Sequence, residues 1–271
     1  MTTVVVGQDT DPPLHKSFVS GEAIVFSTPR PEGTGVNQDA VDLFERTHTA
    51  GVIAVADGVG GAAHGAKASH AAISAVRKKL RGASDAQSMR TAILNGIEYA
   101  NRQVKIIGSG AATTIAVLQI NGARVRPYHV GDSGVLIVSQ RGSLKYNTID
   151  HGPVGYALEA GILDEHEAMH HQERHVISNY VGSDAMRIEL GATLTLGVRD
   201  TALLATDGLF DNLFLSEIVE IIRKGPLMEA AENLITQSRN RMHHESPKEP
   251  GKPDDLTFVL YRRRQHLRPV A

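Results

Sequence analysis

The most constraining feature of this sequence is that its predicted helices and strands are grouped and do not alternate. Two long helical stretches follow each other directly: one covers 62–80, and the next begins with Ser84 as its N-cap. The second helix has one apolar stripe at helical spacing, formed by Met89, Ile93, Ile97, Ala100 and Val104. This grouping argues against a doubly wound parallel sheet. It predicts an α+β fold in which packed sheets are covered by helices.

Short β-branched runs predict the strands. They cover 23–26, 41–45, 52–56, 113–120, 125–130, 135–139, 193–198, 202–205 and 256–261. The runs 193–198 and 202–205 are close enough to predict an antiparallel hairpin. Ser216 is expected to cap a third helix, and a fourth follows Pro226. The polar, proline-rich stretch 243–253 is expected to be an exposed loop before the last strand.

Composition excludes several classes of protein. The 271 residues can bury a full core, and no linker forces a second domain, so one domain over 1–271 is expected. A net charge of -2 gives no basic excess for nucleic acid, and the absence of cysteine removes thiolate chemistry and sulfur-bound zinc. No apolar run is long enough to span a bilayer, and the start does not resemble a signal peptide. We therefore expect a soluble, cytoplasmic protein whose chemical groups are carboxylates and histidines.

Carboxylates recur where predicted strands end. Asp57, Asp132 and Asp207 each stand beside a glycine next to an apolar run, and Asp254 directly precedes the last strand together with Asp255. A single copy is explained by turn chemistry, since Asp-Gly favours hairpins. Four copies clustered beside a core would be costly without a compensating cation. Carboxylate and main-chain oxygens are the ligands that hard divalent cations prefer, which indicates a metal site.

The ordered set VADGVGG, GAATTIAVL, VGDSGVLIV, LLATDGLFDNL and DDLTFVLY, preceded by GVNQDA at 35–40, resembles the PPM (type 2C) family of metal-dependent serine/threonine protein phosphatases, in its bacterial form. The resemblance covers about residues 20–261. It implies a four-layer αββα sandwich, with two central antiparallel sheets flanked by pairs of helices. This fold agrees with the grouping derived above.

The resemblance also implies a dimetal mechanism. Asp57 would bridge two Mg²⁺ or Mn²⁺ ions, the Gly58 carbonyl would complete one ion, and Asp207 and Asp254 would hold the other. Asp39 would orient metal-bound water, and Asp132 and Asp211 match positions that help to hold a third, weaker ion. Water activated by two cations attacks phosphorus in line, while the ions offset charge on the phosphoryl oxygens. The implied substrate is phosphoserine or phosphothreonine in a protein, and the implied partner is a cognate serine/threonine kinase or its targets.

Two departures from the family pattern keep alternatives open. The family usually has an arginine five residues before the aspartate of the opening motif, where it clamps the substrate phosphate; this chain has Thr34 there. Either Arg30 replaces it, or phosphate binding is weaker, or the substrate differs. A histidine that often follows the glycine pair is replaced by Ala62, with His64 two places later. A non-catalytic or weakly active regulatory module on the same fold is therefore the alternative function.

Other motifs compete with this interpretation. His166–His170 satisfies the H-E-x-x-H zinc-protease pattern, but its surroundings are charged, and Asp164 with Glu167 predicts a capping box on an exposed helix. The segment 148–181, which contains it, corresponds to the family's variable flap, associated with substrate selection. The sequence Gly131–Gly134 imitates a serine-protease motif but lacks the other members of a triad.

Overall fold

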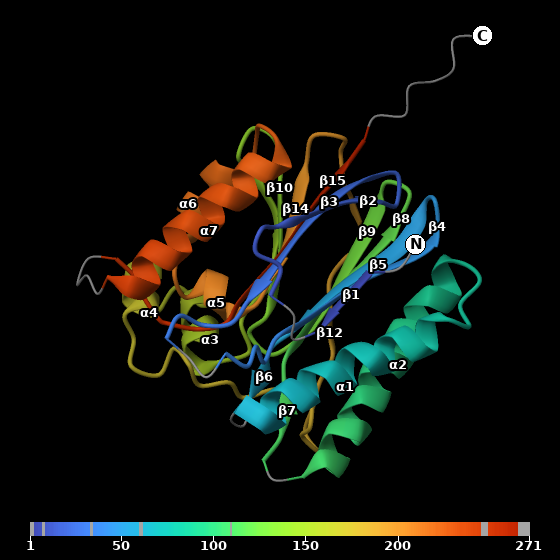
Figure 1. Ribbon diagram of the computed structural model, residues 1–271, viewed down its shortest axis with the longest axis horizontal. Coiled ribbons are helices and arrows are strands. Elements are labelled where there is room, and N and C mark those ends of the chain that lie inside the picture. The colour runs from blue at the N-terminus through green and yellow to red at the C-terminus, as the bar shows by residue number, and fades with distance from the viewer. Residues whose placement is uncertain are drawn as a thin grey trace.

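A computed structural model describes residues 3–6, 9–32, 35–59, 62–108, 110–244 and 249–264. Two antiparallel sheets pack face to face, and a pair of helices covers the outer face of each (Figure 1). The α+β fold and the four-layer αββα sandwich predicted from the sequence are confirmed. Among the described residues, no helix is both long enough and apolar enough to cross a bilayer.

The two sheets differ in which parts of the chain they take. The first has the order β1 (Thr3–Val6), β4 (Ala40–Thr47), β5 (Ala50–Ala56), β8 (Ile115–Asn121), β9 (Arg124–Val130) and β12 (Glu189–Leu190), and β13 (Leu194–Thr195) also pairs with β9. The second has the order β11 (Leu144–Asn147), β10 (Gly134–Val138), β14 (Thr201–Ala205), β15 (Leu256–Arg263), β3 (Gly21–Thr28) and β2 (Leu14–Phe18). A short pair, β6 (Gly58–Val59) and β7 (Ala112–Thr113), stands apart from both.

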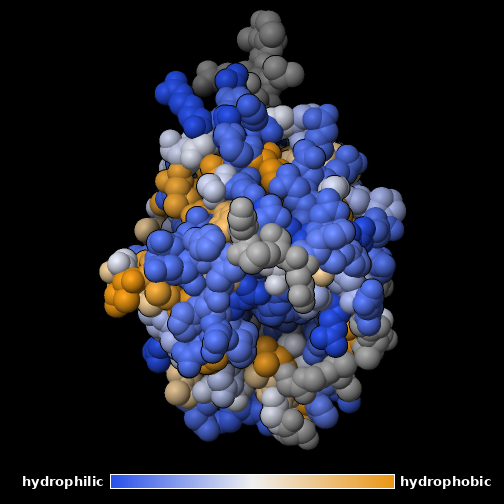
Figure 2. Space-filling view, turned by 90° about the vertical axis from the view of Figure 1, so that its left-hand side faces the viewer, coloured by the Kyte–Doolittle hydropathy of each residue, from blue (hydrophilic) through white to orange (hydrophobic). Residues whose placement is uncertain are grey.

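The helices fall into two covering pairs and three short elements. Helices α1 (Ala62–Leu80) and α2 (Ala86–Ile107) cover the first sheet, and α6 (Leu215–Ile222) and α7 (Leu227–His243) cover the second. The short helices α3 (Pro153–Glu159), α4 (Glu165–Met169) and α5 (Asp207–Phe210) lie at one end of the second sheet (Figure 1). The surface on the α6 and α7 side is mostly hydrophilic, with apolar groups gathered at one edge (Figure 2).

Three apolar cores hold the four layers together. One lies between α1, α2 and the first sheet and contains the predicted stripe of α2, including Ile93 and Ile97. The second lies between the sheets, and the third lies under α6 and α7. Burying each large aliphatic side chain stabilises the fold by about 1.5–3 kcal/mol before entropy is counted. The central strands β5 and β14 are buried along nearly their whole length, so their ends are held firmly in place.

Two helix caps differ from the sequence prediction. The N-cap of α2 is Asp85, not Ser84, because the Asp85 carboxylate accepts the Ser88 backbone N–H while the Ser88 hydroxyl accepts the Asp85 N–H, each at 2.8 Å. This reciprocal pair satisfies two donors at once. Helix α6 has Phe214 as its N-cap, not Ser216, because the Glu217 carboxylate accepts the Phe214 N–H at 2.9 Å.

The predicted hairpin over 193–205 is wrong. Residues 194–195 pair with β9 of the first sheet, whereas β14 pairs with β10 and β15 of the second. The chain therefore crosses between sheets at the intervening turn, where the Asp200 carboxylate accepts the Gly197 N–H at 2.7 Å. The predicted exposed loop 243–253 is also only partly right. Residues 245–248 lie outside the described part of the chain, but Pro250 is buried and the Lys252 side chain turns inward.

Candidate active site

The strand register of the first sheet places two predicted acids side by side. Ala40 of β4 lies opposite Ala56 of β5, so Asp39, which precedes β4, and Asp57, which follows β5, lie at the same end of this strand pair. Asp39 is buried, and its backbone N–H donates to the Asn37 side chain at 2.9 Å. The sequence pattern of an acid at a strand end therefore becomes a pair of acids at one sheet edge.

The strand register of the second sheet likewise brings three further acids to one end. Gly134 of β10 pairs with Ala205 of β14, and Ala205 pairs with Phe258 of β15. Asp132, Asp207 and Asp254 therefore lie at one end of three neighbouring strands. Asp211 follows one turn after Asp207, at the end of α5.

A hydrogen bond links Asp39, beside the first sheet, to the end of β14 in the second sheet. The Thr206 hydroxyl, at the end of β14, donates to Asp39 Oδ2 at 2.9 Å. Mutual electrostatic effects connect the same groups, since the charge of Asp207 raises the pKa of acids on both sheets. We call this group the carboxylate cluster; it consists of Asp39, Asp57, Asp132, Asp150, Asp207, Asp211 and Asp254.

Close backbone contacts fix the geometry on two sides of the cluster. Gly58 packs against the backbone of Gly65 in the first turn of α1, and a Cβ on either glycine would collide with the carbonyl of the other. Gly208 packs in the same way against the Asp255 carbonyl. The Asp255 carboxylate accepts the backbone N–H groups of Arg30 and Gln38 at 2.8 and 2.6 Å, which ties the loop before Asp39 to β15. Glycine is required at these positions because of space.

Burial makes the carboxylate cluster electrostatically costly. It raises the pKa of Asp39, Asp57 and Asp132 well above the ordinary value, and neighbouring carboxylates raise it further. Burial, again with neighbouring carboxylates, raises the pKa of Asp150 to about 7 and that of Asp254 to about 6. One oxygen each of Asp39, Asp132 and Asp150 is buried without a hydrogen-bond partner. Unpaired hard oxygens of this kind are suited to divalent cations.

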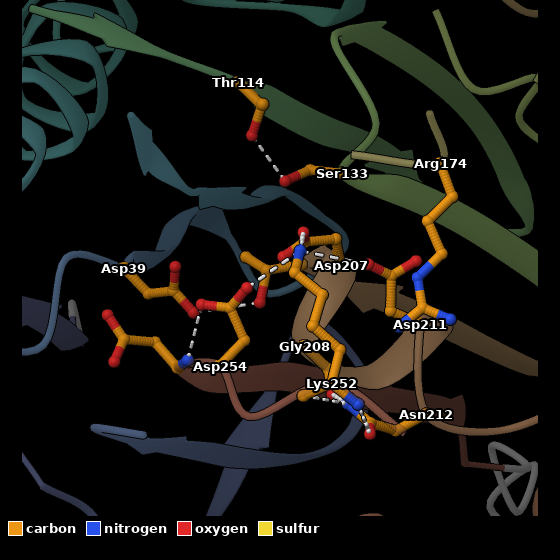
Figure 3. A network of polar contacts seen from close by, with 12 residues as sticks. Asp39, Thr114, Ser133, Arg174, Asp207, Gly208, Asp211, Asn212, Lys252 and Asp254 are labelled. Carbon is orange, nitrogen blue, oxygen red and sulfur yellow. Dashed lines mark hydrogen bonds and ion pairs between the residues drawn. The ribbon is translucent and has the colours of Figure 1, made fainter. Parts of the chain in front are cut away.

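One cation of the protein itself reaches into the cluster. Lys252 Nζ lies 2.5 Å from Asp207 Oδ2, 2.9 Å from Asp254 Oδ2 and 3.0 Å from Asp211 Oδ2 (Figure 3). Burial alone would lower the Lys252 pKa, but these three carboxylates outweigh it and the pKa is raised. Lys252 could not be singled out from the sequence, because an isolated lysine in a polar loop usually points to solvent.

A cavity of about 430 Å³ opens beside the cluster. Asp132, Asp150, Asp207 and Asp211 line one part of it, and apolar side chains line another, namely Val154, Leu158, Ala168, Met169, Phe210, Leu213, Leu215 and Ile218. Several of these residues belong to α3 and α4 of the segment 148–181, which corresponds in sequence to the family's variable flap. Arg174 of this segment donates to the Met169 and Gly251 carbonyls and lies beside Asp211 (Figure 3). The cavity therefore has an acidic part at the carboxylates and an apolar part beside it.

A second group of ionisable side chains, two of them buried, bonds to the turn that carries Asp132. His129, His151 and Glu189 offer ligand-type atoms within 4.8 Å of one another, and we call them the histidine network. His151 Nδ1 accepts the Gly131 N–H at 3.1 Å, so the proton of its neutral ring lies on Nε2, which faces Glu189 at 3.0 Å. His129 stacks on His151 with ring centroids 4.2 Å apart, and burial next to His151 lowers the His129 pKa to about 4. These bonds hold the turn that carries Asp132.

Of the remaining predicted residues, Arg30 and His64 belong to the described part of the chain. Arg30 is exposed, and its guanidinium lies near Asp255. Thr34 lies outside the described residues. His64 is half-buried in the first turn of α1. The capping box of α4 is confirmed, with Asp164 and Glu167 exchanging hydrogen bonds at 2.8 and 2.9 Å.

Comparison with known proteins decides between the families considered above. A profile described as Protein phosphatase 2C matches residues 32–240. The chain belongs to this family. The family's enzyme class is protein serine/threonine phosphatase, as the sequence predicts, and its members depend on metal ions.

Individual relatives agree with this family assignment. Serine/threonine phosphatase stp of Listeria welshimeri is 27% identical over 250 residues, which are 88% of this chain and 94% of that protein. Protein phosphatase PhpP of Streptococcus pneumoniae is 29% identical over 234 residues, which are 83% and 90% of the two chains. The solved serine/threonine phosphatase of S. agalactiae has a TM-score of 0.76 and 27% identity, covering 89% of this chain and 99% of that one. The catalytic domain of PstP, solved with two manganese ions, shares the fold, with a TM-score of 0.69, 22% identity and coverage of 90% and 98%.

Proposed function

We propose that the chain acts as one phosphatase domain that hydrolyses phosphoserine and phosphothreonine in proteins at the carboxylate cluster, with two Mg²⁺ or Mn²⁺ ions as cofactors. The observation that carries the proposal is the convergence of acids from both sheets, with buried oxygens of Asp39 and Asp132 lacking partners. Such a cluster stabilises a protein only when cations compensate its charge. The relative PstP, which was solved with two manganese ions, supports the choice of metal.

The residues divide into three roles in this proposal. Asp57 and the Gly58 carbonyl, together with Asp207 and Asp254, hold the two ions, and Asp132 and Asp211 hold a third, weaker one. Bound there, the ions lower the pKa of water and offset negative charge on the phosphoryl group. Asp39, fixed by the Thr206 hydroxyl, orients the attacking water through its acceptor oxygens. The apolar part of the 430 Å³ cavity excludes water from one side and positions the peptide that carries the phosphate.

The phosphoproteins that serve as substrates require a serine/threonine kinase as their source, and we propose that such a kinase or its targets are the partners. Thr34 stands where the family usually has the arginine that binds the substrate phosphate. Another cation of this chain therefore has to bind the phosphate. Arg174 and Lys252 are the cations that the structure brings nearest to the carboxylates, whereas Arg30 is exposed beside Asp255.

The test is turnover of a phosphothreonine peptide by the full chain with Mn²⁺, with and without excess EDTA. We expect activity that EDTA abolishes and that Mn²⁺ restores. Undiminished activity in EDTA would overturn the metal mechanism. Heat of Mn²⁺ binding without turnover of any phosphoester would instead favour the non-catalytic binding module.

A further inference from the structure

Lys252 directs its ammonium at three acids of the carboxylate cluster. It donates hydrogen bonds to Asp207 at 2.5 Å and Asp211 at 3.0 Å, and it forms an ion pair with Asp254 at 2.9 Å. The Lys252 side chain is only 26% exposed. Its charge therefore neutralises acids that come from both ends of α5 and from the loop before β15.

The backbone beneath Lys252 is anchored, so the position of the ammonium is built into the fold. The buried Asn212 side chain binds Lys252 twice: its Nδ2 donates to the Lys252 carbonyl at 2.9 Å, and its Oδ1 accepts the Lys252 N–H at 2.8 Å. Arg174 holds the preceding Gly251 carbonyl at 3.0 Å. Figure 3 shows the side chain rising from this anchor toward Asp207 and Asp254.

An ammonium and a divalent cation compete for the same carboxylate oxygens. Asp207 and Asp254 are proposed ligands of one ion, and Asp211 of a third, so the acids that Lys252 occupies are among those that the metal needs. We propose that Lys252 is an internal counter-cation: it compensates the cluster when no metal is bound and must leave the carboxylates when an ion binds. This inference rests on the proposed function. It adds that Lys252 sets the metal concentration at which the site becomes occupied.

The first experiment compares the full chain with Lys252→Met, which keeps the aliphatic stem and removes the charge. Calorimetric titration of Mn²⁺ into metal-free protein should give binding that is on the order of tenfold tighter in the variant, because a competing charge about 3 Å from the ligands is gone. In EDTA the variant should unfold at a lower temperature than the natural chain, and saturating Mn²⁺ should close that gap. Lys252→Arg, which retains the charge, should stay near the natural chain in both measurements.

Lys145→Met is the matched control. Lys145 also pairs with an aspartate, Asp200, at 2.7 Å, but at the opposite end of β14 from Asp207. Its loss should change the unfolding temperature equally with and without Mn²⁺ and leave the Mn²⁺ affinity unchanged. Equal Mn²⁺ affinity in Lys252→Met and the natural chain would overturn the inference.

A second measurement needs no variant and so does not depend on Lys252→Met folding. Acetylation of lysines by acetic anhydride, followed by mass spectrometry, reports how free each ammonium is. Mn²⁺ should accelerate acetylation of Lys252 several-fold and leave Lys145 unchanged, whereas continued protection of Lys252 under saturating Mn²⁺ would overturn the inference. A natural chain that binds no Mn²⁺ at all would instead overturn the proposed function itself.

Discussion

Two groups of ionisable side chains lie close to the turn that carries Asp132, the carboxylate cluster and the histidine network, and their polar atoms are satisfied in different ways. In the histidine network, both ring nitrogens of His151 have partners, since one accepts from Gly131 and the other faces Glu189, and His129 leaves a single ring nitrogen, Nδ1, unpaired. In the carboxylate cluster, acceptors outnumber donors, and oxygens of Asp39, Asp132 and Asp150 stay unpaired. The comparison teaches that burial alone does not indicate a metal site. An unmatched surplus of hard acceptors does, because it has to be compensated by bound protons or by cations.

The largest expected effect on activity is that of replacing Asp207, which belongs to the carboxylate cluster and not to the histidine network. Asp207→Asn keeps the shape but removes the charge that a divalent cation requires. We expect phosphatase kcat/KM with Mn²⁺ to fall roughly 10²-fold or more. Steady-state kinetics on a phosphopeptide measures this.

Asp200→Asn is the control for Asp207→Asn, because Asp200 is a buried carboxylate at the other end of β14. It should lower stability but preserve kcat/KM in the folded fraction. Full activity in Asp207→Asn would remove that acid from the proposed site.

The next largest effect is expected on stability, and it tests the histidine network. His151→Ala leaves the Gly131 N–H without its side-chain acceptor in a buried place. We expect the free energy of unfolding to fall by about 1–3 kcal/mol, measured by urea denaturation. Mn²⁺ affinity should change far less than in Asp207→Asn. If His151→Ala abolished Mn²⁺ binding while leaving stability intact, the roles of the two groups would be reversed.

A smaller effect is expected on how stability depends on pH. Burial, with neighbouring carboxylates, raises the pKa of Asp150 from 3.8 to about 7 and that of Asp254 to about 6. Over this range the folded state holds protons that the unfolded chain has released, so the resulting stability is complete below about pH 4 and is lost as the pH rises through about 7. The unfolding temperature in EDTA should therefore fall over this range, by about 2–4 °C for each kcal/mol lost.

Calorimetry across the pH range, repeated with saturating Mn²⁺, checks the pH prediction. Bound cations favour the ionised carboxylates, so Mn²⁺ should remove the downward slope. A flat profile in EDTA would show that the cluster is compensated without protons, and would weaken the contrast with the histidine network.

Much of the fold could be predicted because its signals are local. Helix 62–80 and the stripe of α2 follow from apolar periodicity, and the acids at strand ends follow from short motifs such as VADG. The false hairpin over 193–205 shows the limit: both runs form strands, but partner choice depends on sheets assembled from distant segments. Neither Ser84 nor Ser216 is the N-cap, because Asp85 exchanges hydrogen bonds with Ser88 and the Phe214 N–H donates to the Glu217 carboxylate.

The candidate site, too, could be predicted only in part from the sequence. The identity of its acids could be read from residue type, whereas Lys252 could not, because its inward direction depends on Asn212, 40 residues away. The one available signal was indirect: several clustered anions need a cation, and Lys252 stands two residues before Asp254. The histidine network was missed for a similar reason, since His129 and His151 meet only through strand and loop packing.

The smallest expected effect is that of His166→Ala, which tests whether the H-E-x-x-H pattern binds zinc. Glu167 already accepts the Asp164 N–H at 2.9 Å in the capping box of α4, so the carboxylate that would serve as base has a structural use. His170 Nδ1 bonds the His166 carbonyl at 2.8 Å. We expect His166→Ala to change the free energy of unfolding by less than about 0.5 kcal/mol and to leave phosphatase activity unchanged, whereas Asp164→Ala should cost about 1 kcal/mol. Metal analysis after equilibration with zinc completes the test: stoichiometric zinc that disappears in His166→Ala would make α4 a third ionisable site, built from histidines and not from a surplus of carboxylates.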